Sequence, residues 1–246
     1  MNTEDNDTTL SLDQLRPVEF ILHYTKWAEG SVLAKFGDTH VLCNVSVEED
    51  VPGWLKDRAQ PQGWVTAEYR MLPRSTQERR RQRLFPGGRT KEISRLIGRS
   101  LRAAVELPAL GRRQCIVDCT VLQADGGTRT AAVTGGWVAL ALALRPLVNA
   151  GQVPSAALKE QVAAVSVGIV DGRPALDLDY EQDVAAEVDC NVVMTASGEL
   201  VEIQGTAEKA TFSRTALNEL LDLAQRGIGE LIRLQERALE LAAPRP

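Results

Sequence analysis

Residues 129–149 constrain the fold most strongly, because they are typical of a helix without a polar face. The run TAAVTGGWVALALALRPLV contains one charged side chain, Arg145, and is rich in alanine, glycine and leucine. A helix that is apolar on all sides belongs in a protein interior, and small residues permit close backbone packing. The rest of the chain must therefore supply elements that cover it.

Strand-like segments and two further helices accompany this helix. Runs rich in β-branched and aromatic residues, separated by turn residues, predict strands; they are VEFILHYT, SVLAKFGDTHVLCNVSVEE, WVTAEYRML, QCIVDCTVLQAD, QVAAVSVGIV, RPALDLDY, CNVVMTA and ELVEIQGTAE. Apolar spacings of three and four predict helices over 89–107 and from an N-cap at Ser213 onward. No linker divides the chain, so we expect one α/β domain over 13–246, built from two βα-type halves, and a disordered tail over 1–12.

Composition argues against several classes of protein. No run of about 18 apolar residues indicates a membrane span, and the acidic start MNTEDNDTTL lacks the basic and apolar regions of a signal peptide. We therefore expect a cytoplasmic protein. The four cysteines form no C-x-x-C pair, and the two histidines, His23 and His40, are too few for a typical zinc site. Buried, reduced thiols are the expected state of the cysteines.

Charge is strongly segregated along a chain whose formal net charge is −5. Residues 70–102 contain eleven Lys or Arg and two Glu, whereas residues 177–208 contain nine Asp or Glu and no Lys or Arg. A basic block favours a polyanionic partner. An acidic block favours either a cation site or a solvated surface. The two blocks together point toward a nucleic acid and a metal ion.

Two glycine-rich turns each precede a predicted helix, and both contain an arginine. They are the segments GGRT at 87–90 and GGTRT at 126–130. A helix start offers free backbone N–H groups and the positive end of the helix dipole, and arginine adds a fork of donors that matches phosphate. Each turn is a candidate phosphate site, although taken alone each is more often an ordinary loop. Neither turn has the spacing of a P-loop.

The run DLDYEQD at 177–183 supplies candidate carboxylates. In a strand, Asp177 and Asp179 point to the same face, while Asp183 lies past the expected strand end and Asp189 lies beyond it. Mg²⁺ usually takes one or two carboxylates together with substrate phosphate. The spacing of Asp177 and Asp183 allows such a site, but an exposed acidic loop is the commoner meaning of that spacing.

Several motifs in this order resemble bacterial RNase PH. The matching runs include LRPV, QGWVTAEYRMLPRST, GGRTKEISRLIGRSLRAAV, LQADGGTRTAAVTGG and DLDYEQDVAAEVDCNVVMT. The resemblance covers about residues 13–240, nearly the whole chain. It implies the RNase PH domain, a fold of mixed sheets packed with helices that is related to the second domain of ribosomal protein S5, and hence an α/β (α+β) class.

The resemblance also implies an activity and an assembly. Such enzymes use inorganic phosphate as co-substrate to trim tRNA precursors beyond the CCA terminus. They release nucleoside diphosphates, and the reverse reaction adds nucleotides. Ribosomal and other structured RNAs are further expected substrates. The expected assembly is a homohexamer, a trimer of dimers.

The resemblance assigns residues to each role. Phosphate-binding positions fall on Arg89, Gly127, Thr128 and Arg129. The expected catalytic and Mg²⁺-binding carboxylates fall on Asp177 and Asp183. RNA-binding positions fall on Arg74 and Arg79, and Arg70, which stands where family members commonly have Gly, is expected to join them.

Two other functions are consistent with parts of the sequence. A non-catalytic subunit of a larger ring would bind RNA, but such a subunit is expected to lack the phosphate arginines or the aspartates, and this chain has both. A hydrolytic two-metal nuclease would use the carboxylates but leaves the two arginine-bearing turns without a role. Release of nucleoside diphosphates only in the presence of phosphate would distinguish a phosphate-dependent exoribonuclease from both of these alternatives.

Overall fold

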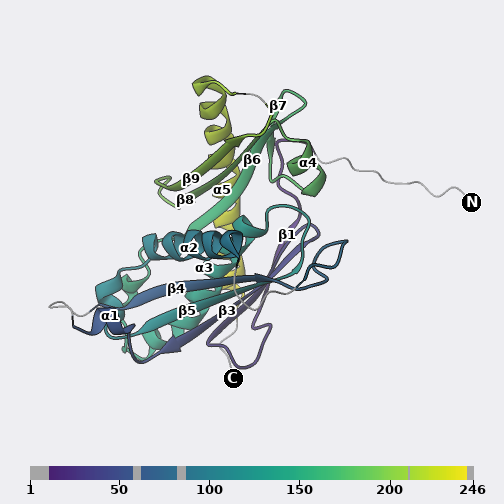
Figure 1. The fold of residues 1–246 in the computed structure, drawn as a ribbon. Helices are drawn as coiled ribbons and strands as arrows, with labels where there is room; N and C mark the ends of the chain where they lie inside the picture. Colours follow the sequence, from purple (N-terminus) through teal and green to yellow (C-terminus); the bar gives the residue numbers. More distant parts are fainter. Residues whose placement is uncertain (1–10, 58–61, 82–86, 210, 243–246) are drawn as a thin grey trace, which may run out of the picture.

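The computed structural model describes residues 11–57, 62–81, 87–209 and 211–242. These residues form two β-sheets with helices packed on them (Figure 1). The first sheet has the order β1-β2-β3-β5-β4 and consists of β1 (Val18–Leu22), β2 (Gly30–Phe36), β3 (Thr39–Glu48), β4 (Trp64–Met71) and β5 (Gln114–Gln123). Neighbouring strands are antiparallel except β4 and β5, which run parallel.

The second sheet is antiparallel throughout and has the order β7-β6-β8-β9. It consists of β6 (Val162–Val170), β7 (Arg173–Leu176), β8 (Val188–Thr195) and β9 (Leu200–Ala207). The helices are α1 (Gly53–Lys56), α2 (Gly88–Ala103), α3 (Thr128–Asn149), α4 (Tyr180–Ala185) and α5 (Arg214–Glu240), with short 3₁₀ turns η1 (Leu107–Leu110) and η2 (Ser155–Ala157). The expected class of mixed sheets packed with helices is confirmed.

Helix α3 joins the two sheets, as its apolar sequence predicts. It packs against β2 and β3 of the first sheet and against β6 of the second. A Cβ on Gly30 would lie 1.9 Å from the carbonyl oxygen of Ala139, so β2 approaches the helix more closely than any larger residue allows. By length and composition α3 resembles a membrane span, but 78% of its most apolar window is buried inside the protein. It is therefore a core helix, and one hydrophobic core runs through both sheets.

The long C-terminal helix begins where the sequence predicts. Ser213 is the N-cap of α5, and its hydroxyl accepts a hydrogen bond from the backbone N–H of Ala216 at 3.1 Å. The helix packs against β6, β7 and β8. Buried Gln235 donates from Nε2 to the carbonyl oxygens of Thr134 and Val162, at 3.0 and 3.1 Å, which ties α5 to α3 and β6.

The chain departs from the sequence-based expectation after β7. RPALDLDY was expected to be a strand throughout, but β7 ends at Leu176 and Asp177 takes a left-handed φ of 55°. Asp179 then caps α4, where its side chain accepts from the backbone N–H of Gln182 in a capping box. The strand prediction for 177–180 was wrong because this local cap competes with strand pairing.

Two sequence predictions concern residues that are only partly described. Of the expected tail over 1–12, residues 1–10 lie outside the described residues, whereas the Leu12 carbonyl accepts a backbone hydrogen bond from Leu176 at 2.7 Å. Of the basic block over 70–102, residues 82–86 also lie outside the described residues. The four cysteines are buried free thiols, as expected.

Candidate active site

A cleft of about 720 Å³ is lined by residues from both sheets and from the first turns of α2 and α3. Helix α4 and the segment after β4 complete its walls. The polar and charged side chains that line it are Thr76, Arg80, Arg89, Thr128, Arg129, Ser166, Tyr180, Asp183, Asp189, Asn191, Gln204, Thr206, Glu208 and Lys209. Cations and carboxylates therefore share one cavity.

The glycine turn before α3 forms one wall of the cleft. Gly126 and Gly127 have φ values of 70° and 60°, a region that other residues rarely adopt. A Cβ on Gly126 would lie 2.4 Å from the carbonyl oxygen of Leu178, so the turn packs directly on the chain that enters α4. Thr39 fastens the turn from β3: its Oγ1 donates to the Gly126 carbonyl at 2.6 Å and accepts from the Asp125 N–H at 2.8 Å.

The start of α3 is suited to bind an anion. The described residues provide no side-chain cap for it, and its first turn contains no acidic residue. Its first N–H groups and the positive end of a 22-residue helix are thus available at the cleft. Thr128 lies in this first turn, and its Oγ1 is 2.8 Å from the hydroxyl oxygen of buried Tyr69.

Two arginines add positive charge to this wall. Arg89 lies in the first turn of α2 and Arg129 in the first turn of α3, and both line the cleft. Arg129 is paired with Glu92 at 3.3 Å, and its side chain is 21% exposed. The structure therefore brings together all four residues expected at the phosphate: Arg89, Gly127, Thr128 and Arg129.

Two carboxylates, Asp183 and Asp189, line the same cleft. Asp183 lies in α4, and Asp189 is the second residue of β8. Burial raises the pKa of Asp183, and the charges of Arg89 and Arg129 oppose this rise. Burial and then the nearby charge of Asp183 raise the pKa of Asp189 to about 6. The two acids are therefore close enough to repel each other in a partly desolvated site.

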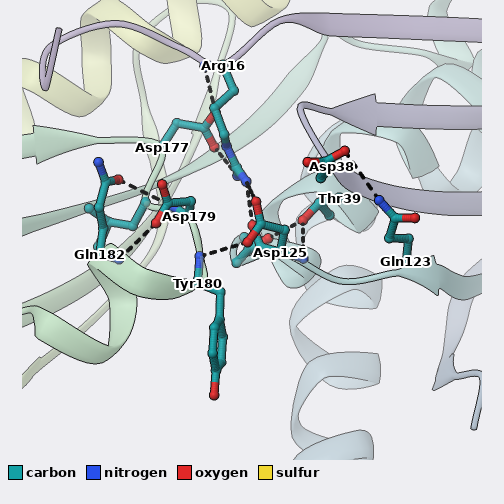
Figure 2. A network of polar contacts seen from close by, with 12 residues as sticks. Arg16, Asp38, Thr39, Gln123, Asp125, Asp177, Asp179, Tyr180 and Gln182 are labelled. Carbon is teal, nitrogen blue, oxygen red and sulfur yellow. Dashed lines mark hydrogen bonds and ion pairs between the residues drawn. The ribbon is translucent and has the colours of Figure 1, made fainter. Parts of the chain in front are cut away.

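Asp177 lies outside this cleft, in a buried ion pair with Arg16 (Figure 2). Its Oδ2 accepts hydrogen bonds from the backbone N–H and the Nε of Arg16, both at 3.0 Å, and its Oδ1 accepts one from Nη2 at 2.8 Å. The Arg16 and Asp177 side chains are 10% and 1% exposed. Both carboxylate oxygens are thus satisfied by one guanidinium. The structure therefore does not bring Asp177 into the cleft that Asp183 and Asp189 line.

The arginine also reaches the phosphate turn. Arg16 Nη1 donates to the carbonyl oxygen of Asp125 at 2.5 Å, and the Asp125 Oδ1 accepts from the backbone N–H of Tyr180 at 3.3 Å. Figure 2 shows Arg16 between Asp177 and Asp125. The pair Arg16–Asp177 therefore fastens the turn before α3 to the entry of α4, which positions the arginine wall against the carboxylate wall.

The three arginines expected to bind RNA lie outside the set that lines the cleft. Arg70, on β4, is 3.8 Å from Asp118, and its side chain is 58% exposed. Exposed Arg74 donates from Nη1 to the Gln77 carbonyl at 2.9 Å, and Arg79 is exposed in the segment after β4. Arg80, which the sequence analysis counted only as part of the basic block, lines the cleft itself.

Sequence reasoning named Asp189 without giving it a role, and it missed Asn191 and Gln204. Asn191 pairs with Ser166 on β6 and with Gln204 on β9, so a row of polar residues crosses the second sheet at the cleft. The acidic block at 177–208 contained a signal for Asp189. The six-residue spacing from Asp177 to Asp183 recurs from Asp183 to Asp189, and spacing alone does not select between the two pairs.

Comparison with known proteins identifies the family to which this chain belongs. The model of domain 1 of the 3′ exoribonuclease family matches residues 14–146, and that of domain 2 matches residues 160–227. Ribonuclease PH of Acaryochloris marina is 57% identical over 228 residues, with 92% of this chain and 95% of the relative covered. Ribonuclease PH of Crocosphaera subtropica is 54% identical over 231 residues, with 94% and 95% covered.

Solved structures show the same fold at lower identity. Rice (Oryza sativa) Rrp46 is 18% identical with a TM-score of 0.76, and 94% of this chain and 98% of that chain are covered. The Archaeoglobus fulgidus exosome with RNA bound to the active site is 21% identical with a TM-score of 0.74, and 94% and 91% are covered.

A fold of this kind, with arginines at two helix starts facing a carboxylate pair, defines an enzyme that handles phosphate groups. The chain belongs to the 3′ exoribonuclease family, where it groups with the bacterial ribonucleases PH. Its activity is phosphate-dependent removal of nucleotides from the 3′ end of RNA.

Proposed function

We propose that the cleft trims the 3′ ends of tRNA precursors beyond CCA, with inorganic phosphate as co-substrate, and that it also acts on ribosomal and other structured RNAs. One observation carries the proposal: the two arginines, the uncapped start of α3 and the carboxylates of Asp183 and Asp189 share one cavity. The cations suit a reaction between two anions, because the repulsion between phosphate and RNA must be neutralised before they can meet.

Inorganic phosphate binds at the start of α3 in this proposal. It is surrounded by the N–H groups of Thr128 and Arg129 and by the guanidinium groups of Arg129 and Arg89. Gly127 permits the left-handed φ of 60° in the turn that presents these N–H groups. An oxygen of the phosphate attacks the phosphorus of the last phosphodiester, and the bond to the 3′ oxygen of the preceding nucleotide breaks. The terminal nucleotide leaves as a diphosphate. The departing 3′ oxygen takes the proton that the attacking phosphate carries at neutral pH, and Asp183 is the candidate group to relay it.

The carboxylates suit a Mg²⁺ ion. Among the described residues, no three His, Cys, Asp or Glu side chains gather in a way that could hold a metal, so a cage made only of protein is not available. Mg²⁺ accepts such a sparse set, since it keeps waters and takes substrate phosphates with one or two carboxylates. Asp183 and Asp189 would hold it, and the ion would offset negative charge on the phosphates. We propose this pair in place of Asp177 and Asp183, because Arg16 already engages both oxygens of Asp177.

RNA reaches the cleft across the basic segment after β4. Arg74 and Arg79 are exposed there, Arg70 lies on the adjoining strand, and Arg80 reaches the cleft. We propose that the first three hold backbone phosphates upstream of the scissile bond. We further propose that six copies assemble in the cytoplasm as a trimer of dimers, which sedimentation of the purified protein will test.

A phosphate-dependence assay tests the function. A tRNA with extra nucleotides after CCA is incubated with the enzyme and Mg²⁺, with and without inorganic phosphate, and the released nucleotides are separated. The proposal expects nucleoside diphosphates with phosphate only and a stop near CCA. Monophosphates in both arms would indicate a hydrolase. Diphosphates released from every RNA without a stop near CCA would contradict the tRNA specificity.

A further inference from the structure

A hydrogen-bonded chain connects Arg129 to α2 and to β9. Arg129 Nη1 donates to Gln204 Oε1 at 2.8 Å and to Glu92 Oε1 at 3.3 Å. The Gln204 Nε2 donates in turn to Glu92 Oε1 and to Glu202 Oε1, both at 2.9 Å. Glu202 is held from the other side by Arg99, through Nε at 2.8 Å and Nη2 at 2.6 Å.

This chain fixes the amide of Gln204 in one orientation. Its oxygen faces the Arg129 guanidinium, and its nitrogen faces the carboxylates of Glu92 and Glu202, so a flipped amide would set donor against donor and acceptor against acceptor. Gln204 lies on β9, opposite Asn191 of β8, and both line the cleft. The floor of the cleft thus presents one acceptor, Gln204 Oε1, to one nitrogen of Arg129.

Only Nη1 of Arg129 is engaged by this network. Within the described part of the chain, no hydrogen-bond partner is found for its Nη2 or Nε. An arginine held by one terminal nitrogen keeps the rest of its planar fork available for a bidentate contact with an oxyanion. The ion pair with Glu92 is partly exposed, at 21% and 35%, so it contributes little to stability.

We propose that Gln204 is a positioning residue that, together with Glu92, holds the Arg129 guanidinium in the orientation that binds the phosphate co-substrate. This role rests on the proposed phosphate site and adds to it the residues that orient the Arg129 guanidinium. Gln204 acts through Arg129 and does not itself contact phosphate. Loss of Gln204 leaves the guanidinium held by Glu92 alone, so its orientation is no longer fixed.

The structure offers a matched control. Arg99 and Glu202 also tie α2 to β9, through two charge-assisted hydrogen bonds, but Arg99 does not contact Arg129. Arg99→Met breaks that tie, while Gln204 keeps the hydrogen bonds to Arg129 and Glu92 that orient its amide. A general need for the α2–β9 contact predicts the same defect in Arg99→Met and Gln204→Leu. The positioning role predicts a defect in Gln204→Leu alone.

The experiment measures phosphorolysis of a 3′-extended RNA by the full chain, with phosphate and RNA varied separately. We expect Gln204→Leu to raise the KM for inorganic phosphate on the order of tenfold, about 1.4 kcal/mol, with the KM for RNA changed less than about twofold. Glu92→Gln keeps the side-chain shape and an acceptor, so its KM for phosphate lies between Gln204→Leu and wild type. In the reverse reaction, the KM for nucleoside diphosphate rises in parallel. Arg99→Met leaves these constants near wild type.

Several results would overturn this role. A wild-type KM for phosphate in Gln204→Leu rules it out, as does an equal rise in Arg99→Met. If Gln204→Leu fails to fold, Glu92→Gln decides alone, and an unchanged KM for phosphate there rejects the proposal. Arg129→Ala tests the phosphate site separately from the positioning role of Gln204. A normal KM for phosphate in that variant removes the phosphate site itself, whereas a raised value in Arg129→Ala with none in Gln204→Leu removes only the positioning role.

Discussion

Replacement of Asp177 by Asn distinguishes a structural role for this carboxylate from a catalytic one. The change keeps the side-chain shape and removes one negative charge from a pair whose side chains are 10% and 1% exposed. Burial alone lowers the pKa of Arg16, and the hydrogen bonds and charge of Asp177 reverse this, so that the pKa lies above its ordinary value. Because arginine keeps its charge in proteins, the guanidinium in the variant loses its buried counter-ion and, among the described residues, keeps only the ion pair with partly exposed Asp125, at 3.8 Å. Breaking one side of such a pair costs about 3–5 kcal/mol.

Urea unfolding at neutral pH and equal protein concentration measures this cost. Asp118→Asn is the matched control, because it makes the same chemical change in an exposed pair with Arg70 at 3.8 Å, where a loss of about 1 kcal/mol at most is expected. Asp183→Asn is the functional comparison. It should lose turnover and keep RNA binding, with the free energy of unfolding within about 0.5 kcal/mol of wild type.

The opposite pattern would refute the reasoning. If Asp177→Asn unfolds at the same urea concentration as wild type and yet loses turnover, its carboxylate works in the chemistry and the buried pair is not what holds this region. If Asp183→Asn keeps full turnover, Asp183 has no part in the mechanism. Both measurements use the same preparations, so a folding defect and a catalytic defect are read separately.

Three further predictions follow from the cleft and its surroundings. Arg129→Ala should lower the phosphorolysis rate by about 10²–10³, the cost of one preorganised donor. A near-normal rate of the variant in single-turnover kinetics at saturating RNA would mean that Arg129 does not bind phosphate. Arg74→Ala and Arg79→Ala should each weaken RNA binding and reduce its dependence on salt; an unchanged slope in a salt titration would mean that neither contacts phosphates. Gly126→Ala should destabilise the fold by at least about 1–2 kcal/mol, because it strains the backbone and approaches Leu178; an unchanged urea midpoint would contradict this packing.

Features that depend on neighbours in the sequence could be predicted from the sequence. The apolar helix at 129–149 is α3, and Ser213 caps α5 as the local pattern indicates. The turn at 126–127 could be recognised because a glycine pair before a helix is typical of a tight turn with positive φ. The arginine that follows it, Arg129, then had to lie at the helix start. The positions of these residues in the fold could be predicted because a few adjacent residues determine them.

The carboxylate pair could not be selected in this way. Asp177 and Asp183 are six residues apart, and so are Asp183 and Asp189, which means that spacing fits both pairs. The choice depends on where β7 ends. A strand that continued through Asp177 would place alternate residues on one face, whereas the left-handed turn there and the cap at Asp179 break the alternation. Asp177 pairs with Arg16, which lies 161 positions earlier in the sequence. No pattern of neighbouring residues around Asp177 predicts such a distant partner.

The ion pair also explains how an acidic segment can adjoin a phosphate site. A Cβ built on Gly127 would lie 3.0 Å from Arg16 Nη2 and 3.7 Å from Asp177 Oδ1, so the pair lies directly behind the turn that receives the anion. An unpaired carboxylate at that position would repel phosphate through a region of low dielectric constant. Arg16 neutralises Asp177 behind the turn, whereas Asp183 and Asp189 line the cleft. The basic and acidic blocks, which are separate along the chain, therefore meet in one cleft, and Asp177 is kept out of it by its pair with Arg16.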